Sequence, residues 1–204
     1  MMGRGKRKGF SGFLYVYFSM PPSAVKTIRD EIFWQYAKLI SKSAGLGINA
    51  RAFQMKKFKQ LQSGEIKWST AIREWLKEKE KAGECIYCGS KTRLSVEHIL
   101  PKCRNGPDRA DNAIMVCRDC NSSKGDKRLF EWFGLEKKDI IPRIAEGKYL
   151  KLLYELHEKA GTLNINKKEL ISKLCPECDE EKLCKKANTE GKLTVYCLEG
   201  TFKK

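Results

Sequence analysis

The sequence lacks the features that mark secreted and membrane proteins. No apolar stretch approaches the ~20 residues that a membrane span needs. No cysteine precedes residue 85, and the nine that follow are an odd number, which argues against a fully disulfide-paired secreted scaffold. The beginning, MMGRGKRKGF and then FLYVYFSM, has too short and too aromatic an apolar run for a signal peptide. We therefore expect a cytoplasmic protein with no membrane partner.

Acidic residues are also in deficit. The chain has 25 Asp and Glu against 41 Lys and Arg, a net charge of +16, and residues 1–84 alone carry 17 basic and 7 acidic side chains. Such an excess favours a polyanionic partner, for which nucleic acid is the usual choice. The alternative is that lysine only keeps a small protein soluble.

Residues 1–84 read as a basic, mainly helical DNA-binding module. A basic arm over residues 1–9 precedes a buried strand at 13–18. Apolar residues at helical spacing then predict helices at about 23–44, 50–62 and 70–82, the first capped by Ser23.

Cysteine spacing dominates the middle of the chain. Two C-x-x-C pairs, Cys85/Cys88 and Cys117/Cys120, are separated by 28 residues. Adjacent pairs of this kind are poor disulfide partners and good metal ligands, and four thiolates with no open position suit a structural Zn²⁺. Cys103 has no partner spacing and is expected to be a small buried residue.

The chain has only two histidines, and one of them lies between these pairs. Residues 94–99 read as a strand that delivers Glu97 and His98, a turn-rich loop covers 101–112, and 113–116 read as a returning strand. A helix is expected over 121–133. These elements predict a ββα unit with zinc at both ends.

This segment resembles the HNH endonuclease family in its His-Asn-Asn form. The resemblance lies in C-x-x-C, EH-I-x-P and DN-x-x-x-x-C-x-x-C-N-x-x-K-G, and the name-giving positions are His98, Asn112 and Asn121. It implies that His98 is a general base that activates water, and that Asn112 fixes the loop and the orientation of His98. It also implies that Glu97 and Asn121 bind one catalytic Mg²⁺ or Mn²⁺, although Asp or His is usual at the position of Glu97.

Each of these positions also has a purely structural reading. His98 can be a structural histidine, Asn112 a turn residue and Asn121 a helix N-cap. Basic side chains beside the motif are candidates to contact DNA phosphates, or only form a solvated face. They are Lys124, Lys127 and Arg128, with Lys102, Arg104 and Arg118 as weaker candidates.

Residues 135–204 are expected to hold helices at 147–160 and 167–174 and a strand at 193–197. A second zinc cluster is predicted there from Cys175, Cys178, Cys184 and Cys197, which makes one or two zinc ions per chain. This second cluster would be structural or would serve as a DNA-contacting finger. His157 has no partner pattern and receives no role.

The sequence thus predicts an α+β protein with a ββα-metal nuclease core at 85–134, between the basic module and a C-terminal helix with a zinc knuckle. The expected activity is hydrolysis of phosphodiester bonds in double-stranded DNA, of a restriction, mobile-element or phage type. A noncatalytic zinc-finger nucleic-acid binder and an RNA-directed nuclease are the alternatives. One site per chain would need a homodimer or two successive nicks to cut a duplex.

Overall fold

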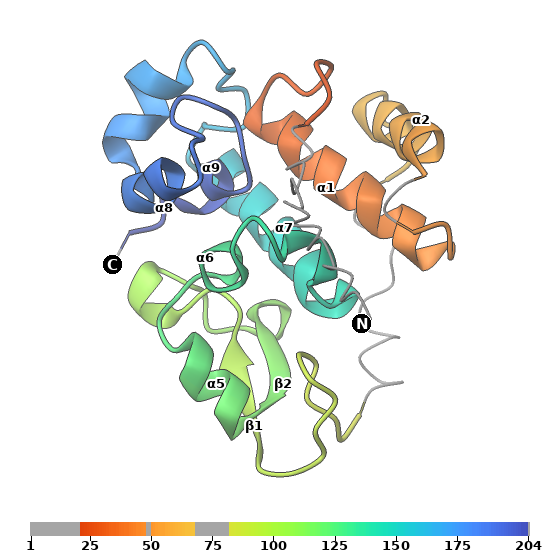
Figure 1. The fold of residues 1–204 in the computed structure, drawn as a ribbon, viewed down its shortest axis with the longest axis vertical. Coiled ribbons are helices and arrows are strands. Elements are labelled where there is room, and N and C mark those ends of the chain that lie inside the picture. The colour runs from red at the N-terminus through yellow and green to blue at the C-terminus, as the bar shows by residue number, and fades with distance from the viewer. Residues whose placement is uncertain (1–20, 48–49, 68–81, 204) are drawn as a thin grey trace, which may run out of the picture.

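The structure is a computed structural model that describes residues 21–47, 50–67 and 82–203. The predicted strand at 13–18 lies outside these residues, as does the predicted helix at 70–82 except for its last residue. Helices form the body of the molecule, and a two-stranded sheet with one helix projects from it (Figure 1). The described part contains no helix long and apolar enough to cross a membrane. The α+β class expected from the sequence is confirmed.

Two helices of the basic segment pack together. Helix α1 (Ile28–Ser43) begins after Thr27 rather than at Ser23. Thr27 and Asp30 form a capping box, in which the Thr27 hydroxyl accepts from the Asp30 amide at 3.1 Å and the Asp30 carboxylate accepts from the Thr27 amide at 3.1 Å. Helix α2 (Arg51–Gln62) lies against α1, where the rings of Trp34 and Phe58 meet edge to face at 6.0 Å.

The second long helix closes this body from the other side. Helix α7 (Arg143–Lys159) packs against α1, with the rings of Phe33 and Tyr154 stacked at 5.9 Å. It begins four residues before the predicted position, directly after Pro142, whose φ of −58° is compatible with a helix start.

The cysteine-rich segment folds as the predicted hairpin and helix. Strands β1 (Leu94–His98) and β2 (Ala113–Cys117) pair antiparallel, with Leu94 opposite Cys117 and His98 opposite Ala113. The connecting loop contains the short helices η1 (Lys102–Arg104) and η2 (Ala110–Asn112). The single helix predicted at 121–133 is wrong: α5 (Arg118–Lys124) and α6 (Leu129–Phe133) are separated at Gly125, whose φ is 54°.

The C-terminal region consists of short elements. They are η3 (Lys138–Ile140), the π-helical η4 (Leu170–Leu174), η5 (Cys175–Glu177), α8 (Glu181–Lys186) and α9 (Tyr196–Glu199). The strand predicted at 193–197 is wrong, since residues 193–195 are irregular and residues 196 and 197 begin α9. Leu193 and Val195 of this segment, and Leu198 after it, are buried in the core.

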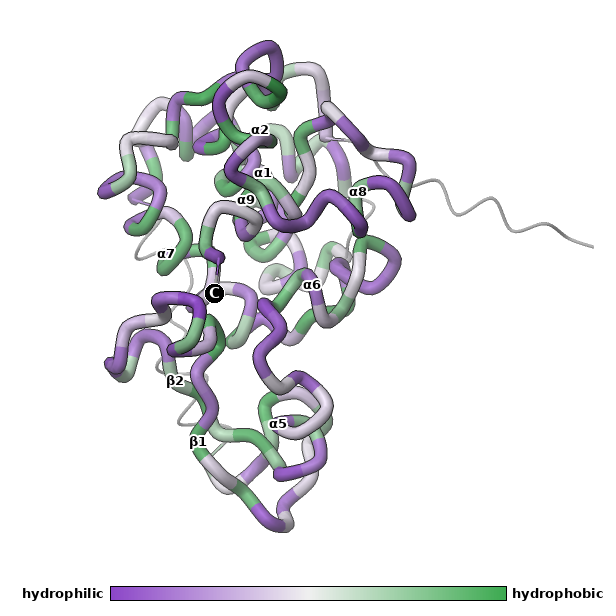
Figure 2. The backbone as a smooth tube through the Cα atoms, turned by 90° about the vertical axis from the view of Figure 1, so that its left-hand side faces the viewer, coloured by the Kyte–Doolittle hydropathy of each residue, from purple (hydrophilic) through white to green (hydrophobic). Residues whose placement is uncertain are grey.

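One hydrophobic cluster joins these parts. It contains buried residues of α1, β2, α6, α7 and α9. Figure 2 shows the hairpin and α5 as a lobe below the body that holds α1, α7 and α8. The three segments expected from the sequence therefore share a core, and boundaries at residues 84 and 134 remain a prediction.

Candidate active site

Four thiols meet at the base of the hairpin. The Sγ atoms of Cys85, Cys88, Cys117 and Cys120 all lie within 4.8 Å of one another, and those of Cys88 and Cys117 are 3.6 Å apart. A tetrahedral Zn²⁺ with bonds of ~2.3 Å would hold its sulfurs about 3.8 Å apart, so the spacing fits zinc. No other group of three or more potential ligands lies this close among the described residues.

The backbone builds this cluster locally. The Gly89 amide donates to the Cys85 carbonyl at 2.8 Å, and Gly89 has a φ of 77°, so the first C-x-x-C pair forms a tight knuckle. The Ile86 amide donates to Met115 of β2 at 2.9 Å, which fixes the knuckle to the hairpin. Burial opposes ionisation of Cys85, but hydrogen bonds from backbone amides and from Cys88 lower its pKa to about 7. This cluster can therefore hold a metal that staples β1, β2 and the start of α5.

The hairpin presents Glu97 and His98 on opposite faces, as neighbouring strand residues must. Glu97 is 4% exposed and points inward, whereas the His98 side chain keeps 24% of its surface exposed at the end of β1. The imidazole is therefore the one of the two that solvent or a substrate can reach.

Asp108 orients the His98 ring. Its Oδ1 lies 2.8 Å from His98 Nε2, and its Oδ2 accepts from Lys102 Nζ at 2.6 Å. Hydrogen bonds from Lys102 and then from His98 lower the pKa of this carboxyl. Asp108 was not among the site residues predicted from the sequence. The signal available was an acidic residue in the loop between His98 and Asn112.

Asn112 holds that loop in place and is fully buried. Its Nδ2 donates to the carbonyls of Leu100 at 2.9 Å and Pro107 at 3.0 Å, and its Oδ1 accepts from the Leu100 amide at 2.9 Å. Gly106 closes the same loop, since a Cβ there would lie 2.0 Å from the Leu100 carbonyl oxygen. Asn112 thus sits where the resemblance needs a residue that fixes the loop.

Asn121 lies on α5 and faces the hairpin. Its Nδ2 donates to the Ser95 hydroxyl of β1 at 3.3 Å. Both residues border a hollow of about 700 Å³. The hollow is lined by Arg93, Leu94, Ser95, Arg118, Asn121, Ser122 and Gly125. His98 and Asn121 have different hydrogen-bond partners, Asp108 for His98 and Ser95 for Asn121.

Glu97, the other predicted metal ligand, already has a cation beside it. Lys124 Nζ lies 2.6 Å from Glu97 Oε1, and the Lys124 side chain is fully buried. A divalent ion needs several oxygen ligands around it. A buried carboxylate paired with an ammonium group does not fit that requirement.

The six predicted phosphate contacts divide by burial. Lys102, Arg118 and Lys127 are exposed. Lys124, Arg104 and Arg128 are buried in ion pairs, so in this structure they cannot reach a DNA phosphate.

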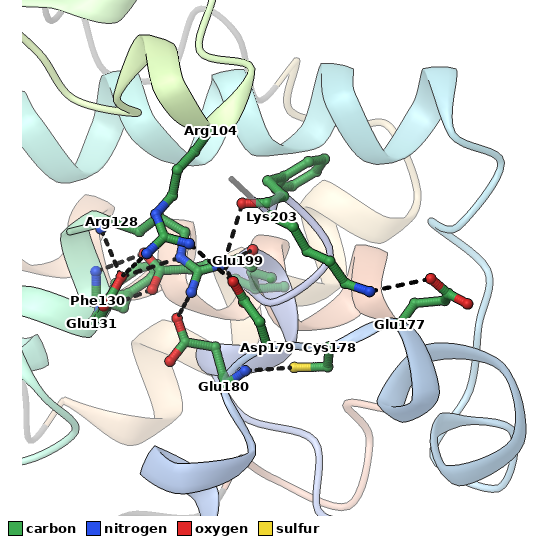
Figure 3. Close-up of polar contacts among 12 residues, drawn as sticks. Arg104, Arg128, Phe130, Glu131, Glu177, Cys178, Asp179, Glu180, Glu199 and Lys203 are labelled. Carbon is green, nitrogen blue, oxygen red and sulfur yellow. Dashed lines mark hydrogen bonds and ion pairs between the residues drawn. The ribbon is translucent and has the colours of Figure 1, made fainter. Parts of the chain in front are cut away.

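Arg128 is the centre of the buried ion pairs (Figure 3). Its Nη1 lies 2.6 Å from Asp179 Oδ1 and donates to the Glu199 carbonyl at 2.9 Å, and its Nη2 pairs with Glu180. Arg104 reaches the same Asp179 at 2.9 Å. These arginines thus fasten the ββα unit to the C-terminal region.

The second cysteine cluster is looser than the first. Among the described residues, no three of Cys175, Cys178, Cys184 and Cys197 form a group that could hold a metal ion as the first cluster does. Burial raises the pKa of Cys178 to about 11 and that of Cys197 to about 12. A second zinc site stays a prediction.

His157 and Cys103, which belong to no motif in the sequence, also have defined positions in the structure. His157 is buried, with Nδ1 2.7 Å from the Thr162 hydroxyl and Nε2 2.9 Å from the Leu198 carbonyl, which is a structural role. Cys103 is exposed, so the expectation that it is buried is wrong.

Comparison with known proteins agrees with the motif. Residues 85–127 match the family model described as HNH endonuclease, which confirms the resemblance seen in the sequence. Neither a curated protein nor a solved structure matches the chain. The match supports a nuclease or nucleic-acid-related function for the ββα unit, and such domains act on DNA and use divalent metals.

Proposed function

We propose that this protein is a metal-dependent DNA endonuclease in which His98 is the general base. The observation that carries the proposal is the position of His98. It lies within the HNH match, at the exposed end of a hairpin stapled by four thiols, with its ring held by Asp108.

The contact with Asp108 supports one arrangement of protons on the two ring nitrogens. With Nε2–H donating to the Asp108 carboxylate, the lone pair of the neutral imidazole is on Nδ1. Nδ1 then takes a proton from water, the hydroxide attacks the phosphorus, and the bond to the 3′ oxygen breaks. That oxygen takes a proton from solvent water, leaving 3′-hydroxyl and 5′-phosphate ends.

DNA would lie across the exposed basic side chains beside the hairpin. Arg118 lines the hollow next to Asn121, and Lys102 lies on the His98 loop. Residues 1–84, with their excess of basic side chains, would add affinity that is independent of sequence. A homodimer would let two such sites cut both strands.

The Mg²⁺ or Mn²⁺ that the family uses does not fit Glu97 as the structure stands, because Lys124 already neutralises that carboxylate. Of the two expected metal ligands, Glu97 and Asn121, only the Oδ1 of Asn121 remains as an oxygen that could bind the ion. Whether cleavage requires the ion is part of the test.

The test is nicking of supercoiled plasmid with Mg²⁺ or Mn²⁺, with and without EDTA. His98→Ala should lower the rate by roughly 100-fold or more, with zinc content and DNA binding unchanged. The matched control is Val96→Ala, because Val96 lies two residues away on the same strand face and is 60% exposed. A His98→Ala protein that nicks at the wild-type rate would remove His98 from the mechanism.

A noncatalytic zinc-finger binder is the second candidate. The buried Glu97–Lys124 pair favours it, since a mere binding module needs no free carboxylate. Duplex binding by a wild-type protein that nicks no DNA under any metal condition would select this alternative.

A further inference from the structure

Lys124 is a buried lysine, and its ammonium group contacts the interior of the site. It is the last residue of α5, its side chain is fully buried, and its ammonium lies 2.6 Å from Glu97 Oε1. The same Nζ donates to the backbone carbonyl of His98 at 3.3 Å. One ammonium group thus contacts both residues of the Glu97-His98 pair.

Other contacts also hold together the elements that carry these residues. The thiol cluster joins the start of α5 to β2, and the β1–β2 pairing carries that constraint to Glu97 and His98. Lys124 then closes the far end of α5 onto β1. A lysine at this point fixes the distance between the helix and the strand end that bears His98.

The buried positive charge of Lys124 requires the negative charge of Glu97. A buried ammonium is stable only beside an opposite charge and with its hydrogen bonds satisfied. Glu97, at 4% exposure, supplies the charge, and the His98 carbonyl supplies an acceptor. Loss of either partner leaves an uncompensated charge in the interior, which is strongly destabilising.

We propose that Lys124 is the resident cation of this site, and that the Glu97–Lys124 pair is a positioning device for His98 rather than half of a metal site. Glu97 anchors Lys124, and Lys124 holds the backbone from which the His98 side chain projects. The inference rests on the proposed function for its kinetic consequence. The pairing itself is independent of that function.

The first experiment measures the pair without any activity. Thermal unfolding and zinc content are compared for wild type, Glu97→Gln, Lys124→Met and the double variant, with the exposed Lys127→Met as the matched control. Each single variant should unfold well below wild type, and the double variant should recover most of the loss because it leaves no buried charge. Additive losses, or a double variant that stays unfolded, would overturn the pairing.

The second experiment asks whether Glu97 binds the catalytic ion. Mn²⁺ binding to wild type and Glu97→Gln is measured by calorimetry on zinc-loaded protein, with His98→Ala as the control. The Kd for Mn²⁺ should be the same within about twofold in wild type and Glu97→Gln. A tenfold weaker Kd in Glu97→Gln, or tighter Mn²⁺ binding in Lys124→Met, would show that the ion competes for Glu97 and would overturn the proposal.

The third experiment separates positioning from stability. The refolded double variant should nick plasmid roughly 10- to 100-fold more slowly at saturating metal, with an unchanged KM for DNA, because small misplacements of a catalytic group cost this much. Wild-type kcat in the double variant would reduce the pair to a structural role. If the wild-type protein nicks nothing, the proposed function fails while the unfolding and Mn²⁺ experiments still decide the pair.

Discussion

Replacing Arg128 with Met tests whether the ββα unit depends on the C-terminal region. The Arg128 side chain is 2% exposed, and its guanidinium lies between Asp179, Glu180 and the Glu199 carbonyl. Methionine fills similar space without charge. Glu180, itself 2% exposed, would then lose its cation.

The expected loss follows from the burial of both partners. Removing one member of a buried pair costs about 3–5 kcal/mol. For a chain of this length each kcal/mol lowers Tm by about 2–4 °C, so Arg128→Met should unfold about 6–20 °C below wild type. Differential scanning calorimetry at neutral pH measures this directly. Because Arg128 faces the interior, the folded variant should bind duplex DNA as tightly as wild type at low temperature.

Two variants control the comparison. Lys127→Met removes the neighbouring exposed lysine and should leave Tm unchanged within about 2 °C, since surface substitutions change stability by only about 0.5 kcal/mol. Arg128→Met/Glu180→Gln should recover part of the loss, because it removes the orphaned carboxylate. A single Arg128→Met variant as stable as Lys127→Met would refute the burial argument. Weakened DNA binding in that variant would return Arg128 to the set of phosphate contacts.

Three further predictions concern metal, salt and pH. Cys85→Ser should yield unfolded or insoluble protein, because structural zinc is coupled to folding. Elemental analysis should find one zinc in the first cluster, and a second only if Cys175, Cys178, Cys184 and Cys197 come together in solution. Folded wild-type protein that contains no zinc would contradict both the folding role and the zinc count. A chain beginning near Gly83 should bind duplex far less tightly than the full chain in a salt titration, and equal affinity at moderate salt would exclude the N-terminal segment as a major contributor. Burial raises the pKa of Glu31 to about 7, so its protonated form stabilises the fold below about pH 4.5 and this contribution is lost as the pH rises to about 7. Glu31→Gln should flatten the stability profile between these pH values and gain up to about 3 kcal/mol of stability at pH 8. Parallel wild-type and variant profiles would show that Glu31 does not cause the pH dependence.

The sequence predicts most reliably what depends on near neighbours. The C-x-x-C spacing predicts the thiol cluster, and short strand-like segments on either side of a turn-rich loop predict β1 and β2, because both signals need only a few consecutive residues. The same local view is ambiguous for residues 193–197, since a short apolar run suits a buried strand and a buried helix equally. It also overlooks Gly125, whose positive φ ends α5 where apolar spacing alone predicts a continuous helix.

Long-range partners explain the other differences. Lys124 and Arg128 stand in a basic stretch beside the zinc knuckle, which is where phosphate contacts are expected. Their carboxylate partners, Glu97 for Lys124 and Asp179 and Glu180 for Arg128, lie 27 to 52 residues away along the chain. Composition cannot show which positive charges are neutralised inside the fold.

The burial of these charges changes how the net charge bears on DNA binding. Of the six basic side chains predicted to contact phosphates, the three that remain exposed are Lys102, Arg118 and Lys127. Lys102 also pairs with Asp108, so its first effect is on the carboxylate that holds His98. Each phosphate contact contributes about 0.9 to the slope of log affinity against log salt. These three side chains should therefore contribute a slope of only about 2 to 3, and a steeper dependence in the full chain would have to come from other basic residues.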